Sequence, residues 1–177
     1  MGEQEAGRVI LPYIPYCGEP SIDPREARAA AIATTLEAIV TQEAPVTVGR
    51  AFRVYLTHCG IKKMGRNVRA DLEKGLTYAI AAKQIEKRQE ALSNDLLQMV
   101  LRIPGKGKDL LRKRGDRNLD EVPPSEIRLA GQYAMLDDVF VEGSDEHCKR
   151  ILEIFDTKRL TVNAKALIEE ALLNAET

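Results

Sequence analysis

Apolar residues recur at every third or fourth position in three successive stretches of the N-terminal half, the spacing of amphipathic helices. The stretches cover about residues 24–40, 48–59 and 66–80. Asp23, followed by a proline, fits the N-cap of the first helix, and Thr47 fits that of the second. Because only a short turn separates the second and third helices, the pattern predicts a helix-turn-helix unit.

The residues after the third helix have a pattern that favours strands. Residues 96–103 are apolar enough for a strand, residues 104–108 form a turn of proline, glycine and lysine, and residues 110–114 fit a second short strand. A β-hairpin at this place would make the unit a winged helix. The alternative interpretation is a flexible charged linker between the two halves of the chain.

The turn and the third helix recur near the C-terminus. Residues 60–76 align without a gap to residues 156–172, an offset of 96 positions. The identical residues of the first copy are Lys62, Asn67, Ala70, Glu73 and Leu76. Since an internal repeat determines the architecture, we expect a mainly α-helical chain of tandem helix-turn-helix, winged-helix-like units, the first with a small β-hairpin wing.

We expect three segments along the chain. Residues 1–22 contain prolines within an apolar run, which excludes a helix and predicts an extended N-terminal arm; the alternative is the tail of a larger preceding domain. The first winged-helix-like unit covers residues 23–118, and the second helix-turn-helix-like unit covers residues 119–177. In the second unit, Ser125 fits the N-cap of the first helix, and no wing follows the last helix.

Composition restricts the classes of function. Of the 177 residues, 26 are Lys or Arg and 27 are Asp or Glu, so the net charge of −1 gives no global attraction to nucleic acid, and any such site must be a local basic patch. There is no apolar run of membrane-spanning length and no signal-peptide pattern. The three cysteines are odd in number and far apart. We therefore expect a cytoplasmic protein with no membrane attachment and no disulfide framework.

A local basic patch surrounds the turn before the third helix, because residues 44–70 contain no acidic residue. In a helix-turn-helix on DNA, the start of the third helix approaches base edges, here with Arg66 and Asn67, while neighbouring cations meet phosphates. The turn at the tip of the expected wing adds two lysines. The expected nucleic-acid-binding residues are Arg50, Arg53, Lys62, Lys63, Arg66, Asn67, Arg69, Lys106 and Lys108. The alternative is a solvated basic face, or one that contacts protein.

We find no residue pattern that indicates catalysis, a metal or a cofactor. His58-Cys59 and His147-Cys148 are adjacent pairs on helices, where side chains point about 100° apart and cannot easily chelate one ion. Residues 105–108 lack the spacing of a phosphate-binding loop, and no Ser-His-Asp or Cys-His arrangement is visible. We therefore expect a protein that is not an enzyme and that needs neither a metal nor a cofactor.

The two repeats resemble a known family, the domain of unknown function numbered 3320. Residues 60–69 match its basic turn and helix start, and residues 122–127 look like the Pro-Pro-x-Glu segment between its two units. The resemblance covers about residues 24–177. It implies a winged-helix-like C-terminal module of large superfamily 1 helicase-like proteins, often beside nuclease-like domains, and hence partners in DNA or RNA processing. It supplies no reaction.

Two functions follow from the sequence. The first is a non-catalytic accessory module that binds nucleic acid, with double-stranded DNA as the expected form, in a helicase or nuclease system. The second is a protein–protein interaction or dimerisation module without nucleic-acid contact, which the near-zero net charge, the acidic second unit and the apolar arm favour. The sequence leaves the oligomeric state open.

Overall fold

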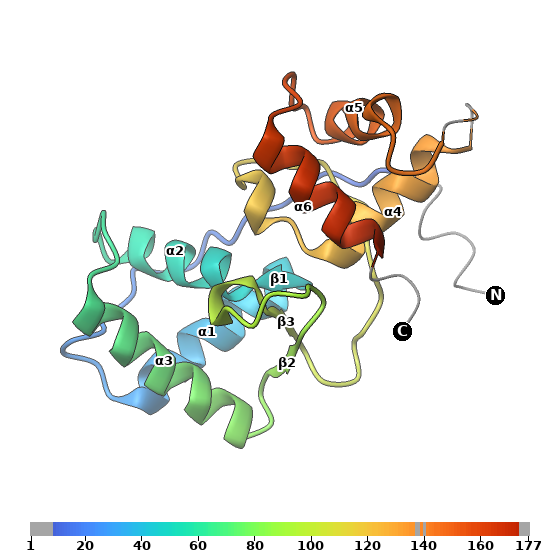
Figure 1. Cartoon of the computed structure of the whole chain (residues 1–177). Helices are drawn as coiled ribbons and strands as arrows, with labels where there is room; N and C mark the ends of the chain where they lie inside the picture. The colour runs from blue at the N-terminus through green and yellow to red at the C-terminus, as the bar shows by residue number, and fades with distance from the viewer. Residues whose placement is uncertain (1–8, 137–138, 140, 174–177) are drawn as a thin grey trace. The chain divides into compact units, whose positions relative to one another are not determined.

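A computed structural model of the chain describes residues 9–136, 139 and 141–173. Their contacts separate two compact units. The N-terminal unit consists of residues 15–88 and 95–107, and the C-terminal unit of residues 9–14, 89–94 and 108–173. Helices predominate, with one small antiparallel sheet in the described part of the chain (Figure 1). The mainly helical, winged-helix-like class predicted from the sequence is confirmed.

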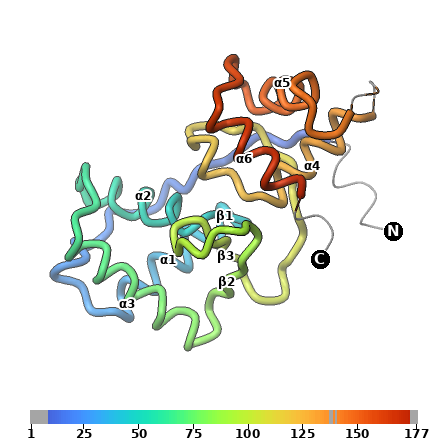
Figure 2. Tube along the Cα trace, in the orientation of Figure 1, coloured from blue at the N-terminus to red at the C-terminus, as the bar shows by residue number. Residues whose placement is uncertain are grey.

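The N-terminal unit has the element order of a winged helix. Its elements are α1 (Ala29–Glu43), β1 (Val46–Thr47), α2 (Val48–His58), α3 (Arg66–Ala81), β2 (Glu86–Arg88), the 3-10 helix η1 (Leu96–Gln98) and β3 (Val100–Arg102). In the sheet β3 lies between β1 and β2, antiparallel to both, so that Leu101 is opposite Val46 and Lys87. The chain passes from α3 into β2 and returns through β3 (Figure 2).

Local signals determine where α2 begins and ends. The Thr47 hydroxyl accepts a hydrogen bond from the Arg50 N–H at 3.2 Å, as expected for an N-cap. At the other end, Gly60 has a φ of 73°, which costs glycine little. The N–H groups of Gly60 and Ile61 then donate to the carbonyls of Thr57 and Leu56, at 3.2 and 2.9 Å. This Schellman arrangement ends α2 and directs the chain into the turn.

The first helix begins later than predicted. The sequence places its N-cap at Asp23, but α1 starts at Ala29. The Asp23 carboxylate instead accepts hydrogen bonds from the backbone N–H and the Nε of Arg25, both at 3.0 Å. The bond from the Arg25 N–H is that of an N-cap, but it caps a single turn over residues 24–26 that does not continue into α1.

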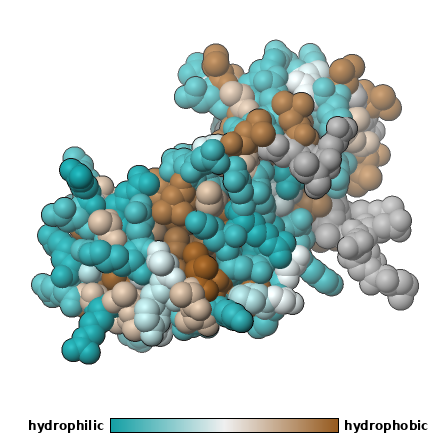
Figure 3. Space-filling model, turned by 60° about the horizontal axis from the view of Figure 1, so that its bottom comes forward, coloured by the Kyte–Doolittle hydropathy of each residue, from teal (hydrophilic) through white to brown (hydrophobic). Residues whose placement is uncertain are grey.

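The core of the N-terminal unit lies where α3 packs against α1. The predicted stripe of Val68, Leu72 and Leu76 is buried. A glycine is required in the same helix, because a Cβ at Gly75 would lie 2.2 Å from Cγ2 of Ile32. Hydrophilic side chains cover most of the face of this unit seen in Figure 3, where a narrow strip of hydrophobic side chains crosses it.

The wing exists, but with different strands from those predicted. Its strands are β2 and β3, joined by residues 89–99. Residues 110–114 take no part in this sheet, since Leu11 of the arm pairs with them: its N–H donates to the Leu111 carbonyl at 2.9 Å, and its carbonyl accepts from the Lys113 N–H at 2.8 Å. The expected turn at 104–108 thus follows the hairpin rather than forming its tip.

The C-terminal unit contains the second helix-turn-helix. Its elements are the 3-10 helix η2 (Leu119–Glu121), α4 (Pro124–Ala134), α5 (Asp145–Ile154) and α6 (Val162–Leu173). Ser144 caps α5 by accepting from the His147 N–H at 3.2 Å, and Thr161 caps α6 by accepting from the Ala164 N–H at 3.1 Å. The expected N-cap at Ser125 is wrong, because this residue lies inside α4, which Pro124 begins.

The backbone reproduces the sequence repeat. Asp156, which aligns with Gly60, has a φ of 53° at the end of α5. The N–H groups of Asp156 and Thr157 donate to the carbonyls of Glu153 and Leu152, at 3.0 and 2.8 Å. These are the hydrogen bonds that end α2, displaced by 96 positions. Both copies therefore share the same backbone turn between their second and third helices.

Segment boundaries differ from those expected. The arm over residues 1–22 does not act as one element, because residues 9–14 pack in the C-terminal unit and residues 15–22 in the N-terminal unit. Residues 108–118, expected in the first unit, pack in the second. Among the described residues, no helix combines the length and the apolar character that crossing a membrane requires.

Candidate nucleic-acid interface

Four of the predicted residues lie together where α3 begins. Lys62 and Lys63 belong to the turn, Arg66 is the first residue of α3, and Asn67 is the second. All four are exposed, and none of them forms an ion pair with another described residue. Their side chains are thus available to a ligand. The core stripe that starts at Val68 directs the opposite face of α3, with Arg66, towards solvent.

The electrostatic environment of this group is positive. The first turn of α3 contains no acidic residue, and its N-cap, Gly65, offers no side-chain oxygen to the free N–H groups. The N-terminal end of the helix dipole therefore adds a partial positive charge to those of Lys62, Lys63 and Arg66. Phosphates are favoured at such helix ends. We call these three cations and Asn67 the basic turn.

Arg69 lies one turn further along α3 but is already paired. Its Nε donates to Glu73 at 2.7 Å, and a second guanidinium nitrogen lies 3.9 Å from Asp95. This hydrogen bond to Glu73 raises the pKa of Arg69 above its usual value. The side chain remains 40% exposed. A phosphate would therefore have to compete with two carboxylates for Arg69, which makes it a weaker contact than the basic turn.

Arg50 was predicted to bind nucleic acid, and this prediction is wrong. The side chain is fully buried, and its Nε and Nη2 donate to the Glu43 carboxylate at 2.9 and 3.1 Å. The Tyr16 N–H donates to the same carboxylate at 2.7 Å. Glu43 immediately precedes the acid-free stretch, so counting charges from residue 44 onwards missed this partner. Arg53, on α2, is half-buried.

Lys106 and Lys108 were predicted to sit at the wing tip, and the structure does not place them there. The hairpin loop covers residues 89–99 and contains no Lys or Arg. Lys106 follows β3, next to the start of β2 and hence beyond the C-terminal end of α3. Arg66 is the first residue of α3, and the 16 residues of this helix span about 24 Å. Lys106 and Lys108 also belong to different units.

The wing loop has a structural role in the C-terminal unit. The Glu90 carboxylate accepts a hydrogen bond from the Ser125 N–H at 3.2 Å, at the start of α4. In return, the N–H groups of Leu92 and Ser93 donate to Glu170 of α6, at 2.9 and 3.3 Å. The loop is therefore held by backbone and carboxylate contacts and presents no cation to a nucleic acid.

Three arginines between residues 100 and 118 lie in the interior of their units. Arg102, Arg112 and Arg117 are buried, which excludes both the basic wing and the flexible linker. Arg112 and Arg117 each bind the fully buried carboxylate of Glu126, with shortest distances of 2.8 and 2.9 Å. The guanidinium carbon of Arg117 also lies 4.0 Å from the centre of the Tyr13 ring. These charges stabilise the C-terminal unit.

The second copy of the turn keeps two exposed cations, Lys158 and Arg159, and an exposed asparagine, Asn163, but it lacks the arginine of the basic turn. Val162, 85% exposed, occupies the position of Arg66. Lys165, the counterpart of Arg69, donates to Asp145 at 2.5 Å. The N-terminal unit alone therefore carries an arginine at the start of the third helix.

Cys59 and Cys148 pack with the two hydrophobic cores, whereas Cys17 is exposed. Burial raises the pKa of the Cys59 and Cys148 thiols, so that both remain protonated near neutral pH. Within the described part of the chain, no group of His, Cys, Asp and Glu side chains is arranged to hold a metal ion.

Comparisons with protein-family models, with curated proteins and with solved structures found no match for this chain. The resemblance to the domain of unknown function numbered 3320 therefore stays a prediction. The function has to be argued from the basic turn and its surroundings.

Proposed function

We propose that the N-terminal unit binds double-stranded DNA through the basic turn and acts as a non-catalytic accessory module. The observation that carries the proposal is the group of exposed, unpaired side chains of Lys62, Lys63, Arg66 and Asn67 at the start of the third helix of a winged-helix unit. In this fold class the third helix enters the major groove. Arg66 and Asn67 would face guanine and adenine edges, and the two lysines would meet phosphates.

The small number of contacts implies weak binding on its own. Each phosphate contact contributes about −0.9 to the slope of log K against log salt, so the two lysines give a slope of about −2. The wing loop, residues 89–99, contains no Lys or Arg and so adds no phosphate contact. Such a module suits a system in which other domains supply most of the affinity, and a helicase or nuclease system fits the resemblance of the repeats.

Fluorescence anisotropy of a labelled duplex at low salt tests the proposal. Lys62→Glu plus Arg66→Glu should weaken binding by about 10- to 100-fold, because it removes a phosphate contact and a base contact. The matched control is Lys106→Glu plus Lys108→Glu, which changes the net charge equally at exposed residues that are not part of the basic turn. The proposal fails if the wild-type chain does not bind, or if the two double variants lose the same affinity.

A further inference from the structure

The end of the wing loop places a carboxylate against the third helix. Asp95 directly precedes η1, and its Oδ1 lies 3.9 Å from a guanidinium nitrogen of Arg69 on α3. The same oxygen accepts a hydrogen bond from the Leu97 N–H at 3.1 Å, which holds the carboxylate at the start of η1. The wing loop, which contains no Lys or Arg, therefore offers a negative charge to the helix that carries the basic turn.

A second carboxylate holds the same guanidinium from within α3. Glu73 accepts a hydrogen bond from the Arg69 Nε at 2.7 Å, one helical turn further along. Arg69 itself follows Arg66 by three positions, and residues at this spacing are neighbours on the surface of a helix. A DNA backbone that passes along the start of α3 therefore comes within reach of a cation that two carboxylates already occupy.

These ion pairs are exposed enough for a phosphate to compete with them. The Arg69 side chain is 40% exposed, and those of Glu73 and Asp95 are 37% and 49% exposed. Ion pairs between groups in contact with water are weak. A phosphate can accept two parallel hydrogen bonds from a guanidinium, but it has to displace both carboxylates first. The carboxylates therefore reduce what Arg69 contributes to DNA binding without removing it.

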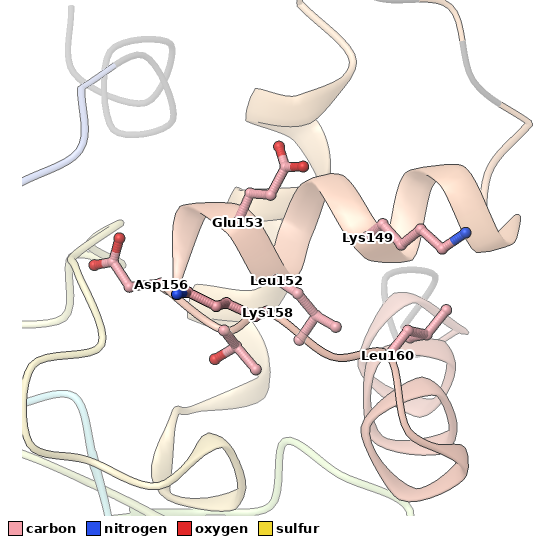
Figure 4. Close-up of a pocket in the computed structure, with 7 residues that line it drawn as sticks. Lys149, Leu152, Glu153, Asp156, Lys158 and Leu160 are labelled. Atoms are coloured by element: carbon pink, nitrogen blue, oxygen red, sulfur yellow. The ribbon is translucent and has the colours of Figure 1, made fainter.

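The turn of the second copy shows a different placement of acids. There, Asp156 and Lys158 both lie between the end of α5 and the start of α6 (Figure 4). The first turn, residues 60–65, contains no acid. In the first copy the carboxylates therefore act on Arg69 and leave the lysines of the basic turn exposed.

A cation held by two carboxylates recurs at this helix position in the second copy. Lys165, at the position of Arg69, lies 3.8 Å from Glu169, four residues later in α6, and 2.5 Å from Asp145 of α5. The counterpart of Asp145 in the first copy is Gly49, so the second carboxylate comes from the wing loop instead. Arg69 is thus held by an acid that the repeat itself does not supply.

We propose that Glu73 and Asp95 limit the affinity of the basic turn for DNA by occupying Arg69, a further phosphate contact. The inference rests on the proposed function and deepens it, because it assigns the residues that set the affinity of the same site. Glu73 and Asp95 act only through Arg69 and are positioning residues. A merely structural ion pair would change stability but not the number of phosphates that the unit contacts.

Anisotropy of the labelled duplex, measured with the full chain over a series of salt concentrations, tests the proposal. Glu73→Gln plus Asp95→Asn should raise the affinity at least about threefold at low salt and steepen the slope of log K against log salt by about 0.9. Both substitutions keep the side-chain shape, and asparagine still caps η1. The matched control, Glu37→Gln plus Glu86→Gln, changes the net charge equally outside α3 and the wing loop, and should stay within about twofold of the wild-type affinity.

Arg69→Gln shows whether the gain passes through this guanidinium. In the wild-type chain the substitution should cost less than about twofold in affinity, whereas added to Glu73→Gln plus Asp95→Asn it should remove both the gain and the steeper slope. Urea unfolding checks that each variant is folded. The inference is overturned if the double variant gains nothing, if the gain persists without Arg69, or if the control gains as much.

The two proposals fail in different ways. If Lys62→Glu plus Arg66→Glu binds the duplex as tightly as the wild-type chain, the proposed function is wrong, and this inference is overturned with it. If that variant loses affinity while Glu73→Gln plus Asp95→Asn binds like the wild-type chain, only this inference is overturned.

Discussion

Glu126→Gln is expected to destabilise the C-terminal unit by a large part of its folding free energy. The carboxylate is fully buried in α4, between the guanidinium groups of Arg112 and Arg117. It accepts two hydrogen bonds from the Arg112 side chain, at 3.3 and 2.8 Å, and two from the Arg117 side chain, both at 2.9 Å. A fifth comes from the Arg112 backbone N–H, at 3.0 Å.

Glutamine has the shape of the glutamate but not its charge. One acceptor oxygen becomes an NH₂ group that faces guanidinium donors, and two buried cations lose their shared counter-ion. Removing one partner of a buried ion pair costs about 3–5 kcal/mol. Single domains are stable by only about 5–15 kcal/mol, so the loss should be visible as extensive unfolding at moderate urea concentrations.

Hydrogen exchange followed by mass spectrometry locates the effect. Amides of α4, α5 and α6 should exchange faster in Glu126→Gln, because their free energy of opening falls by about 3 kcal/mol or more. The matched control is Glu153→Gln, whose ion pair with Arg150 is exposed on both sides, and which should change stability by no more than about 1 kcal/mol. If the two variants behave alike, the buried cluster is not what stabilises this unit.

Three smaller predictions test single positions. Asp156→Gly should be more stable than Asp156→Ala by about 1 kcal/mol in urea unfolding, because only glycine adopts a φ of 53° without strain; equal stabilities would contradict this conformation. Gly115→Ala should destabilise by about 1–3 kcal/mol, since its Cβ would lie 2.7 Å from the Tyr13 ring. Gly143→Ala, at a similar φ but in open space, is the control for that substitution and should lose clearly less thermal stability. The Arg25 guanidinium lowers the pKa of Asp23 from 3.8 to about 2. The ionised Asp23 carboxylate therefore stabilises the fold fully above pH 3.8, and this stabilisation disappears as the pH falls through 2. An NMR titration of Asp23 with a midpoint near 3.8 would refute the interaction.

The helix-turn-helix frames could be predicted because local residues determine them. Each helix cap is a hydrogen bond between a hydroxyl and the N–H three residues later, as at Thr47, Ser144 and Thr161. Gly60 ends α2 through its own positive φ. The strand β2 could not be predicted in the same way. It is short, it lies at the edge of the sheet, and its charged residues are exposed or half-buried, so the sequence shows no alternation.

The candidate site was predicted less completely, because burial of a charge depends on distant partners. Arg50 and Arg117 look like solvated cations in the sequence, yet both are enclosed around a buried glutamate. Glu43 and Glu126 supply those counter-charges from other helices. Only cations without such partners remain as candidates. A count of basic residues therefore overstates the number of candidate binding residues, and the tertiary structure favours those of the basic turn.

The two copies show which positions of a repeat carry information about binding. Lysines recur at 62 and 158 because both turns are exposed, so they cannot distinguish the roles of the copies. The differences lie next to them: Arg66 against Val162, and Gly60 against Asp156. The first difference removes a side chain suited to a base edge, and the second adds a charge that repels phosphates. Since the same hydrogen bonds form the turn at both places, these substitutions, rather than the fold, make the first turn the candidate for DNA binding.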